Sequence, residues 1–159
     1  MTSFVLNPGT LGLADVRAIL NQEMVIELPS SCGEALCRSV EIVERIVESE
    51  KTVYGVNTGF GKLAQKKIPQ DQVEALQENL VLSHATGTGP LLDDRIVRLM
   101  MVLKINALAQ GYSGIRAEVV EALLTLVNAK IYPCVPAKGS VGASGDLAPL
   151  AHMSAALLG

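Results

Sequence analysis

Charged side chains are scarce in this sequence. They make up 18% of its 159 residues, whereas about 25% is usual in a soluble domain, and apolar residues make up 49%. A membrane span does not explain the surplus, because a spanning helix needs about 20 mostly apolar residues and polar side chains such as Lys104, Glu121 and Asp146 interrupt the long apolar stretches. We therefore expect other protein, either further chain or other subunits, to cover part of the apolar surface.

Concentrated positive charge is also missing. The net charge is −3, and no cluster of Lys and Arg provides the basic patch that nucleic-acid binding requires. The first residues lack the basic segment and apolar run of a secretory signal peptide, so we expect a cytoplasmic protein. The three cysteines, Cys32, Cys37 and Cys134, lack the paired spacing of a zinc site, and we expect packing thiols and no metal. Small-molecule chemistry is the class of function that remains.

Most of the apolar residues recur at the spacing of a helix. Ser31 and Glu34 form a capping box ahead of one such run, and the run after Asp93 is apolar on nearly all faces, as in the interior of a bundle. The sequence predicts helices over residues 11–20, 31–51, 71–84, 93–112 and 115–129 and from 146 onward, and a strand over 24–28. The short connection at Ser113-Gly114 favours antiparallel neighbours. We predict a mainly α chain, an antiparallel helical bundle with a few short strands and Gly-rich loops, in a single unit over residues 1–159.

A Gly-rich segment, residues 139–145, interrupts the helical pattern and has a chemistry of its own. The Gly145 nitrogen can approach the Ala143 carbonyl, because glycine has no Cβ to block the sharp turn that attack requires. Loss of water closes a five-membered ring, and a second dehydration at Ser144 leaves a conjugated methylidene group. The product is an electrophile made without an external cofactor. Asp146 opens the following helix, whose N-terminal field favours the anion that forms when a nucleophile adds.

The tripeptide Ala-Ser-Gly by itself is typical of an ordinary helix entry, so its surroundings carry the information. Four stretches resemble, in order and spacing, the aromatic amino-acid lyases: residues 54–61 (YGVNTGFG), 82–89 (LSHATGTG), 104–116 (KINALAQGYSGIR) and 139–152 (GSVGASGDLAPLAH). In that family Ala-Ser-Gly cyclises to methylidene-imidazolone. The resemblance implies the N-terminal part of the ammonia-lyase fold and the same autocatalytic cofactor here, built from Ala143, Ser144 and Gly145 and supported by Asp146.

The resemblance also implies roles for residues outside the cyclising turn, which is formed by Ala143, Ser144 and Gly145. Tyr54 matches the base that removes the β-proton of the substrate, and because a free tyrosine has a pKa of about 10, this role needs surroundings that stabilise the phenolate. Ser83-His84 matches the family members that prefer histidine, whereas members acting on phenylalanine or tyrosine tend to carry bulky residues there. The implied reaction is non-oxidative elimination of ammonia from L-histidine to trans-urocanate, in histidine catabolism. A tyrosine or phenylalanine ammonia-lyase, and more weakly an aminomutase, remain alternatives.

Family members are several times longer than this sequence. We therefore expect residues 1–159 to be an N-terminal portion that lacks the C-terminal helical part, and a truncated, non-catalytic lyase fragment is a further alternative. The family forms tetramers whose active sites draw on several subunits, which implies a homo-oligomer. His152 is expected to be structural and to help hold the cyclising turn. Asn57, Asn106 and Arg116 lie in matched motifs and receive no catalytic step.

Two rival sites fit less well. The run 142–145 begins like the G-x-S-x-G elbow of acyl-transfer enzymes, but Asp146 replaces the final glycine and no strand of an α/β sheet is predicted before it. The run 59–62 begins like a phosphate-binding loop, but Leu63 replaces the required Ser or Thr. The same glycines fit a dinucleotide fingerprint only loosely, because no strand-helix-strand frame surrounds them.

Overall fold

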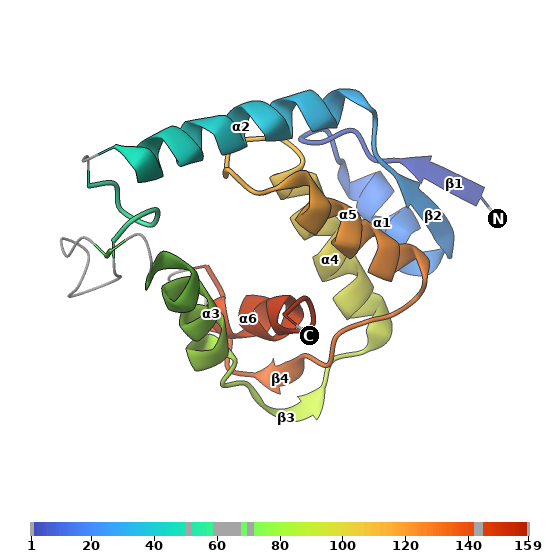
Figure 1. Ribbon diagram of the computed structural model, residues 1–159. Coiled ribbons are helices and arrows are strands. Elements are labelled where there is room, and N and C mark those ends of the chain that lie inside the picture. The colour runs from blue at the N-terminus through green and yellow to red at the C-terminus, as the bar shows by residue number, and fades with distance from the viewer. Residues whose placement is uncertain (1, 50–51, 59–67, 70–71, 142–144, 159) are drawn as a thin grey trace.

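The computed structural model describes residues 2–49, 52–58, 68–69, 72–141 and 145–158. The described chain is mainly helical (Figure 1), which confirms the predicted fold class. The helices are α1 (Leu13–Asn21), α2 (Ser31–Glu48), α3 (Val73–His84), α4 (Asp94–Leu108), α5 (Ala117–Asn128) and α6 (Leu147–Ala155). The strands are β1 (Thr2–Val5), β2 (Met24–Glu27), β3 (Thr88–Leu91) and β4 (Pro136–Lys138).

The N-terminal strands pair in parallel, with α1 as the connection between them. Thr2 is opposite Met24 and Val5 is opposite Glu27. The sequence predicted β2, whose Ile26 is buried, but it did not predict β1. Parallel strands need a connection of about a dozen or more residues, usually a helix, and α1 fills this role.

Helix α4 supplies the centre of the core. Its buried side chains pack with others from α1, β2 and α5, and the buried set includes Ile19, Ile26, Val97, Met101, Val102, Ile105, Val120, Leu123 and Val127. Helix α5 runs back beside α4 (Figure 1), as the short connection predicted. Helix α4 is not covered on all sides, because Ile96 and Leu103 are 46% and 41% exposed.

Arg98 of α4 is buried, and its guanidinium joins three backbone segments. It donates to the carbonyl oxygens of Ile19, of Gln22 (3.4 Å) and of Met24 (3.1 Å). The last carbonyls of a helix have no partner within the helix, and a cation near them is favourable. Arg98 therefore closes the C-terminal end of α1 and fixes β2 against α4.

The turn between α4 and α5 begins earlier than the sequence predicted, at Leu108 instead of Tyr112. Gly111 has a φ of +75°, and a Cβ on it would lie 2.7 Å from the backbone carbon of Ala35 in α2. Only glycine combines this backbone conformation with so close an approach. The close approach of α2 thus requires glycine at this turn.

Helix α2 lies across one side of the molecule (Figure 1), and its start corrects the predicted capping box. Ser30 occupies the N-cap and its side chain makes no capping hydrogen bond, whereas Ser31 is already helical. A capping box requires the serine to precede the first turn. The box with Glu34 is therefore not formed.

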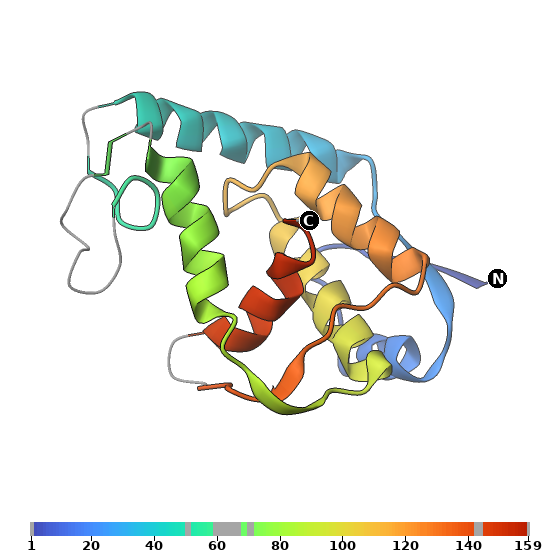
Figure 2. The same ribbon diagram turned by 60° about the horizontal axis from the view of Figure 1, so that its bottom comes forward.

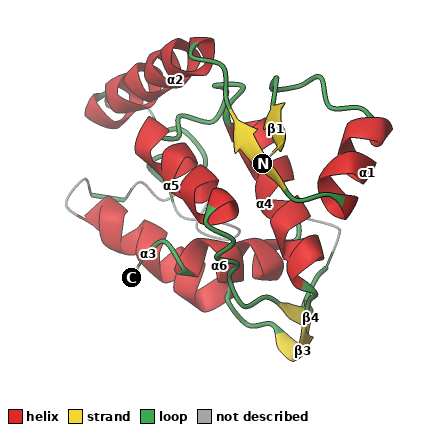
Figure 3. Cartoon of the chain, turned by 90° about the vertical axis from the view of Figure 1, so that its right-hand side faces the viewer, coloured by secondary structure: helices red, strands yellow, loops and turns green. Residues whose placement is uncertain are grey.

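Helices α3 and α6 pack together beside the ladder of β3 and β4 (Figures 1 and 3). The two strands are antiparallel, with Thr88 opposite Lys138 and Leu91 opposite Pro136, and the register shifts between these pairs. The sequence predicted residues 86–90 only as a helix stop, because glycine and proline are unfavourable in strands. The ladder brings the segment after α3 next to the segment before α6.

The cysteines agree with the sequence prediction only in part. Cys32 is buried, and its burial raises the pKa of its thiol. Cys37 and Cys134 are exposed, so the prediction that they are packing residues was wrong, although both are free thiols. In the part of the chain that the structure describes, no helix has both the length and the apolar composition to cross a membrane.

Candidate active site

Tyr54 lies on a short turn between α2 and α3 that is closed by two buried polar side chains. The Asn57 Oδ1 accepts from the Val53 N–H (2.9 Å), and the Thr58 Oγ1 accepts from the Gly55 N–H (3.4 Å). Asn57 and Thr58 are 2% and 0% exposed, whereas Tyr54 is 63% exposed. Local side-chain to backbone bonds of this kind favour turns over helix or strand. The buried residues of the motif therefore anchor the turn, and the phenol is presented at its surface.

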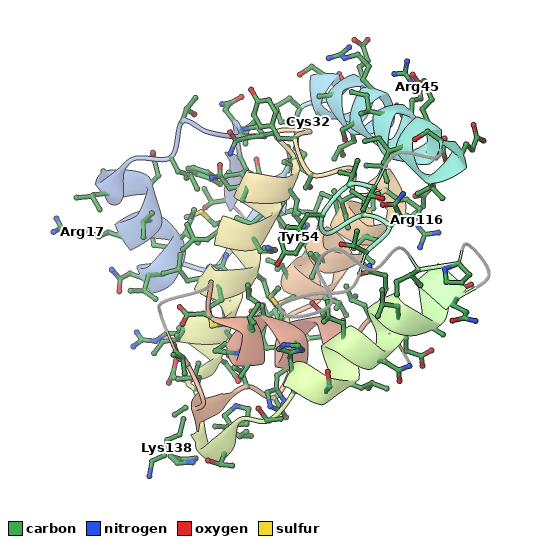
Figure 4. The ribbon with its side chains drawn as sticks, turned by 90° about the vertical axis from the view of Figure 1, so that its left-hand side faces the viewer. Arg17, Cys32, Arg45, Tyr54, Arg116 and Lys138 are labelled. Carbon is green, nitrogen blue, oxygen red and sulfur yellow. The ribbon has the colours of Figure 1, made fainter. Side chains whose placement is uncertain are left out.

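Tyr54 and the pair Ser83-His84 lie near opposite ends of α3. Figures 1 and 2 show residues 52–58 beside the N-terminal end of α3. Figure 4 shows Tyr54 between α2 and α3. Ser83 and His84 lie at the opposite, C-terminal end of α3, so the length of this helix separates the two predicted parts of the site.

Ser83 and His84 form a linked pair at the end of α3. The His84 Nδ1 lies 2.7 Å from the Leu80 carbonyl oxygen, and the Ser83 hydroxyl donates to the same oxygen at 3.1 Å. A carbonyl oxygen can only accept, so the His84 Nδ1 carries the proton in this contact. In the neutral ring the Nε2 then carries the lone pair and is able to accept a hydrogen bond. The helix itself thus sets the tautomer of His84.

Of the cyclising turn, Ala143 and Ser144 lie outside the described residues, and the flanking residues define its two ends. Gly145 has a φ of +95°, and a Cβ on it would meet nothing within 4 Å. Asp146 has a φ of +52° and occupies the N-cap of α6, as the sequence predicted, but its side chain makes no capping hydrogen bond. Its carboxylate accepts instead from the hydroxyl of Ser140. The two ends of the turn are therefore joined side chain to side chain.

His152 connects α6 to the segment that follows His84. Its Nε2 accepts from the Gly87 N–H at 2.9 Å, so in the neutral ring its Nδ1 carries the proton. Figure 2 shows the start of α6 beside the C-terminal end of α3. The structure thus brings together the neighbourhoods of two predicted elements, Ser83-His84 and the helix after the cyclising turn.

Sequence reasoning missed Ser140 and Gly87. The only sequence signal for either was its place within a matched motif, because each acts through a partner that folding brings close. Of two other motif residues, the Asn106 Oδ1 accepts from the Gly9 N–H at 3.0 Å, and Arg116 occupies the N-cap position of α5 without a side-chain capping hydrogen bond.

A hollow at the other side of the core is lined by Glu23, Arg98, Lys130 and Tyr132, among others. Its charged groups have partners: the Lys130 Nζ lies 2.5 Å from the Glu23 Oε2 and lowers the pKa of that carboxyl, and Arg98 binds carbonyl oxygens. None of the predicted site residues lines it. Within the described ranges, no group of three or more His, Cys, Asp and Glu side chains is arranged to hold a metal ion.

The comparisons with known proteins agree with the four motifs. The model of the aromatic amino acid lyase family matches residues 11–159. The histidine ammonia-lyase of Psychromonas ingrahamii is 56% identical over 154 residues, which are 97% of this chain and 30% of that protein. The crystal structure of histidine ammonia-lyase from Trypanosoma cruzi matches with a TM-score of 0.85 at 35% identity, over 98% of this chain and 29% of that chain.

A second solved structure, tyrosine aminomutase from Streptomyces globisporus, matches with a TM-score of 0.89 at 32% identity, over 99% of this chain and 30% of that chain. The chain spans about 30% of the length of the curated relatives that it matches. The family model covers nearly all of the sequence, including the four stretches that first suggested the resemblance. The chain belongs to the aromatic amino acid lyase family.

Proposed function

We propose that the full-length protein eliminates ammonia from L-histidine and releases trans-urocanate. The observation that carries this proposal is the pair Ser83-His84, in which α3 fixes the tautomer of the imidazole. The high identity to proteins named histidine ammonia-lyase supports the same substrate. Residues 1–159 then form the N-terminal unit of the enzyme, and the remaining chain completes it.

In this proposal Ser83 and His84 bind the imidazole of the substrate. The His84 Nε2, as the lone-pair nitrogen of the neutral ring, accepts a hydrogen bond from an N–H of the substrate ring. The Ser83 hydroxyl shares the Leu80 carbonyl with the His84 Nδ1 and holds the ring in place. A phenyl ring has no donor to offer at this point, so the pair disfavours phenylalanine. The phenol O–H of tyrosine could donate to the same nitrogen, so the preference for histidine over tyrosine is supported by the identity to histidine ammonia-lyases.

We assign the cofactor to Ala143, Ser144 and Gly145. The Gly145 nitrogen bonds to the Ala143 carbonyl carbon, the carbonyl oxygen leaves as water, and Ser144 loses its hydroxyl and α-hydrogen as a second water. The described end of the turn fits this group, because Gly145 has a left-handed backbone with open space around its Cα and Asp146 is held by Ser140. When formed, methylidene-imidazolone supplies an electrophilic methylidene carbon that activates the substrate for loss of ammonia.

Tyr54 is the proposed base for the β-proton. Asn57 and Thr58 hold its turn from the buried side, so the exposed phenol has a rigid base from which to meet a substrate. A tyrosine acts as a base only where its phenolate is stabilised. In this proposal the surroundings that do so come partly from other chain segments of the assembled enzyme.

The proposal extends to the oligomeric state of the enzyme and to its location in the cell. We propose a homo-oligomer, a tetramer as in the family, because several large apolar side chains are exposed, among them Leu82 and Leu103. We also propose that the enzyme works in the cytoplasm, where Cys37 and Cys134 would stay as the free, exposed thiols that they are in this structure.

The second candidate is a tyrosine or phenylalanine lyase, or an aminomutase, using the same cofactor. The likeness to tyrosine aminomutase favours it at the level of the fold. The identity of 32% is lower than the 56% to a histidine ammonia-lyase, and the Ser83-His84 pair argues for imidazole. We therefore rank it below histidine elimination.

The test uses the full-length protein and its Ser144→Ala variant. The wild type is expected to form urocanate from L-histidine, and its Ser144 peptide is expected to be lighter by two waters. The variant should keep both waters and lose turnover by about a thousandfold or more, since that factor corresponds to about 4 kcal/mol of transition-state stabilisation. Ser154→Ala, in helix α6, is the control and should keep wild-type turnover.

Three results would contradict the proposal. Normal turnover by Ser144→Ala would refute the proposed cofactor. A clear preference for phenylalanine or tyrosine would refute the proposed substrate. A β-amino acid product would make the protein an aminomutase. Mass analysis of residues 1–159 alone tests whether this unit closes the ring without the remaining chain.

A further inference from the structure

Gly87 lies where three segments of the chain meet. Its N–H donates to the His152 Nε2 of α6 at 2.9 Å. A Cβ on Gly87 would lie 2.9 Å from that same nitrogen and 3.1 Å from the Pro136 Cβ of β4. A Cβ on Gly139, just beyond β4, would lie 3.0 Å from the Gly87 Cα. The junction is therefore built around a residue without a side chain.

The junction joins the two parts of the proposed site. Gly87 follows His84 by three residues, and His152 follows Asp146 by six residues, along the helix that starts at the cyclising turn. The two bonded residues are 65 positions apart in the sequence. Helices α3 and α6 also pack against each other. This hydrogen bond therefore links the segment after the proposed imidazole subsite to the helix that follows the proposed cofactor segment.

The chemistry of the bond defines what His152 does. Its Nε2 lone pair is occupied by the Gly87 N–H, so this nitrogen is not available to take a proton from a substrate. Its Nδ1 carries the proton in the neutral ring and has no lone pair in the ring plane to act as a base. His152 in this arrangement holds a backbone and does not act as a general base.

We propose that His152 is a positioning residue: through Gly87 it fixes where His84 stands relative to the cofactor turn, and so sets how the imidazole of the substrate is bound. This inference rests on the proposed function. A purely structural histidine would affect mainly folding when it is replaced. For a positioning residue we expect replacement of His152 to change substrate binding more than it changes the stability of the fold. A displacement of about 1 Å in a positioned group is enough to impair a site.

The experiment compares four single variants and one double variant of the full-length protein. His152→Leu removes the acceptor, and His152→Gln keeps an acceptor at similar reach. Gly87→Ala inserts a methyl group into the junction, and Gly33→Ala is its control, because a Cβ on Gly33 in α2 would meet nothing within 4 Å. For each variant the KM for L-histidine, kcat, the mass of the Ser144 peptide and the unfolding temperature are measured.

The expected result is a split between KM and kcat. His152→Leu and Gly87→Ala should raise the KM about tenfold, the effect of losing one hydrogen bond of ordinary strength, while the Ser144 peptide still lacks two waters and kcat falls less. His152→Gln should return the KM to within about threefold of the wild type, and Gly33→Ala should leave it unchanged. The double variant His152→Leu with Gly87→Ala should be no worse than the poorer single variant, because both break the same contact.

The inference is overturned if His152→Leu keeps the wild-type KM, or if His152→Gln is impaired as much as His152→Leu. If His152→Leu does not fold, the KM of His152→Gln and Gly87→Ala decides: a normal KM in Gly87→Ala overturns the inference. A wild-type protein that does not turn over histidine at all would instead refute the proposed function, and the two failures are thereby distinguished.

Discussion

At the scale of single residues, Asp146 stands at a helix N-cap but does not cap the helix with its side chain. It stands at the N-cap of α6, where aspartate normally accepts from the first free N–H groups of the helix. Its backbone is left-handed, with a φ of +52°, and its carboxylate accepts from Ser140 instead. Asparagine and aspartate tolerate this conformation better than most residues. The side chain thus holds the two flanks of the cyclising turn together.

The bond from Ser140 gives a prediction for cofactor formation. Ser140→Ala removes the donor, and because both residues are exposed the loss should be about 1 kcal/mol, or roughly a fivefold slower ring closure. The measurement is the fraction of the Ser144 peptide that lacks two waters, followed over time after synthesis of the full-length protein. Ser140→Thr keeps a hydroxyl and serves as the matched control. Equal rates for Ser140→Ala and the wild type would show that the bond does not assist closure.

At the scale of elements, the turn between α4 and α5 depends on its contact with α2. Gly111 brings its backbone against Ala35, and a Cβ on the next turn glycine, Gly114, would lie 2.2 Å from the Val43 Cγ2. The sequence shows the two glycines, but their contacts with Ala35 and Val43 are not visible in the local pattern of α4. The close approach of α2 therefore requires glycine at two positions that are far from it in the sequence.

Gly111→Ala is expected to destabilise the fold. A Cβ there meets backbone atoms of Ala35 at 2.7 Å, and backbone yields less easily than the end of a side chain. Together with the left-handed φ, this clash should cost about 2 to 4 kcal/mol. Thermal or urea unfolding of the full-length protein provides the measurement. Gly33→Ala, within α2 and without a clash, should be neutral or slightly stabilising, and equal behaviour of the two variants would contradict this account.

At the scale of the whole molecule, the described chain leaves large apolar side chains on its surface. Leu82 of α3 is 53% exposed, Ile96 and Leu103 of α4 are 46% and 41% exposed, and Tyr112 is 89% exposed. Single exposed apolar residues are common, but exposure on several elements together is typical of surfaces that bind other protein. These exposed side chains fit the low charge and high apolar content of the sequence.

The full-length protein is therefore expected to be an oligomer. Light scattering after size-exclusion chromatography should give a mass that is a multiple of the single chain. Leu103→Asp should lower that mass if another subunit covers α4, whereas Lys104→Asp, one position along the same helix, is the control for added negative charge. A single-chain mass for the wild type at working concentration would contradict the prediction.

The local pattern of the sequence determined most of the helices. Helix α5 is an example, since its buried residues Val120, Leu123 and Val127 recur at helical spacing and neighbouring residues alone create that periodicity. The motifs determined the family in the same way, because they are contiguous stretches. The predicted roles of Tyr54, Ser83 and His84 come from that resemblance and remain proposals.

Only the tertiary structure decided the features that depend on distant partners. Strand β1 forms because β2 lies beside it, and β3 forms against β4, although its own residues are poor strand formers. The bonds of Arg98 to Ile19 and of Gly87 to His152 span 79 and 65 positions. A hydrogen bond between two short segments has no local periodicity to reveal it, so the link between the two parts of the proposed site became visible only when the chain was folded.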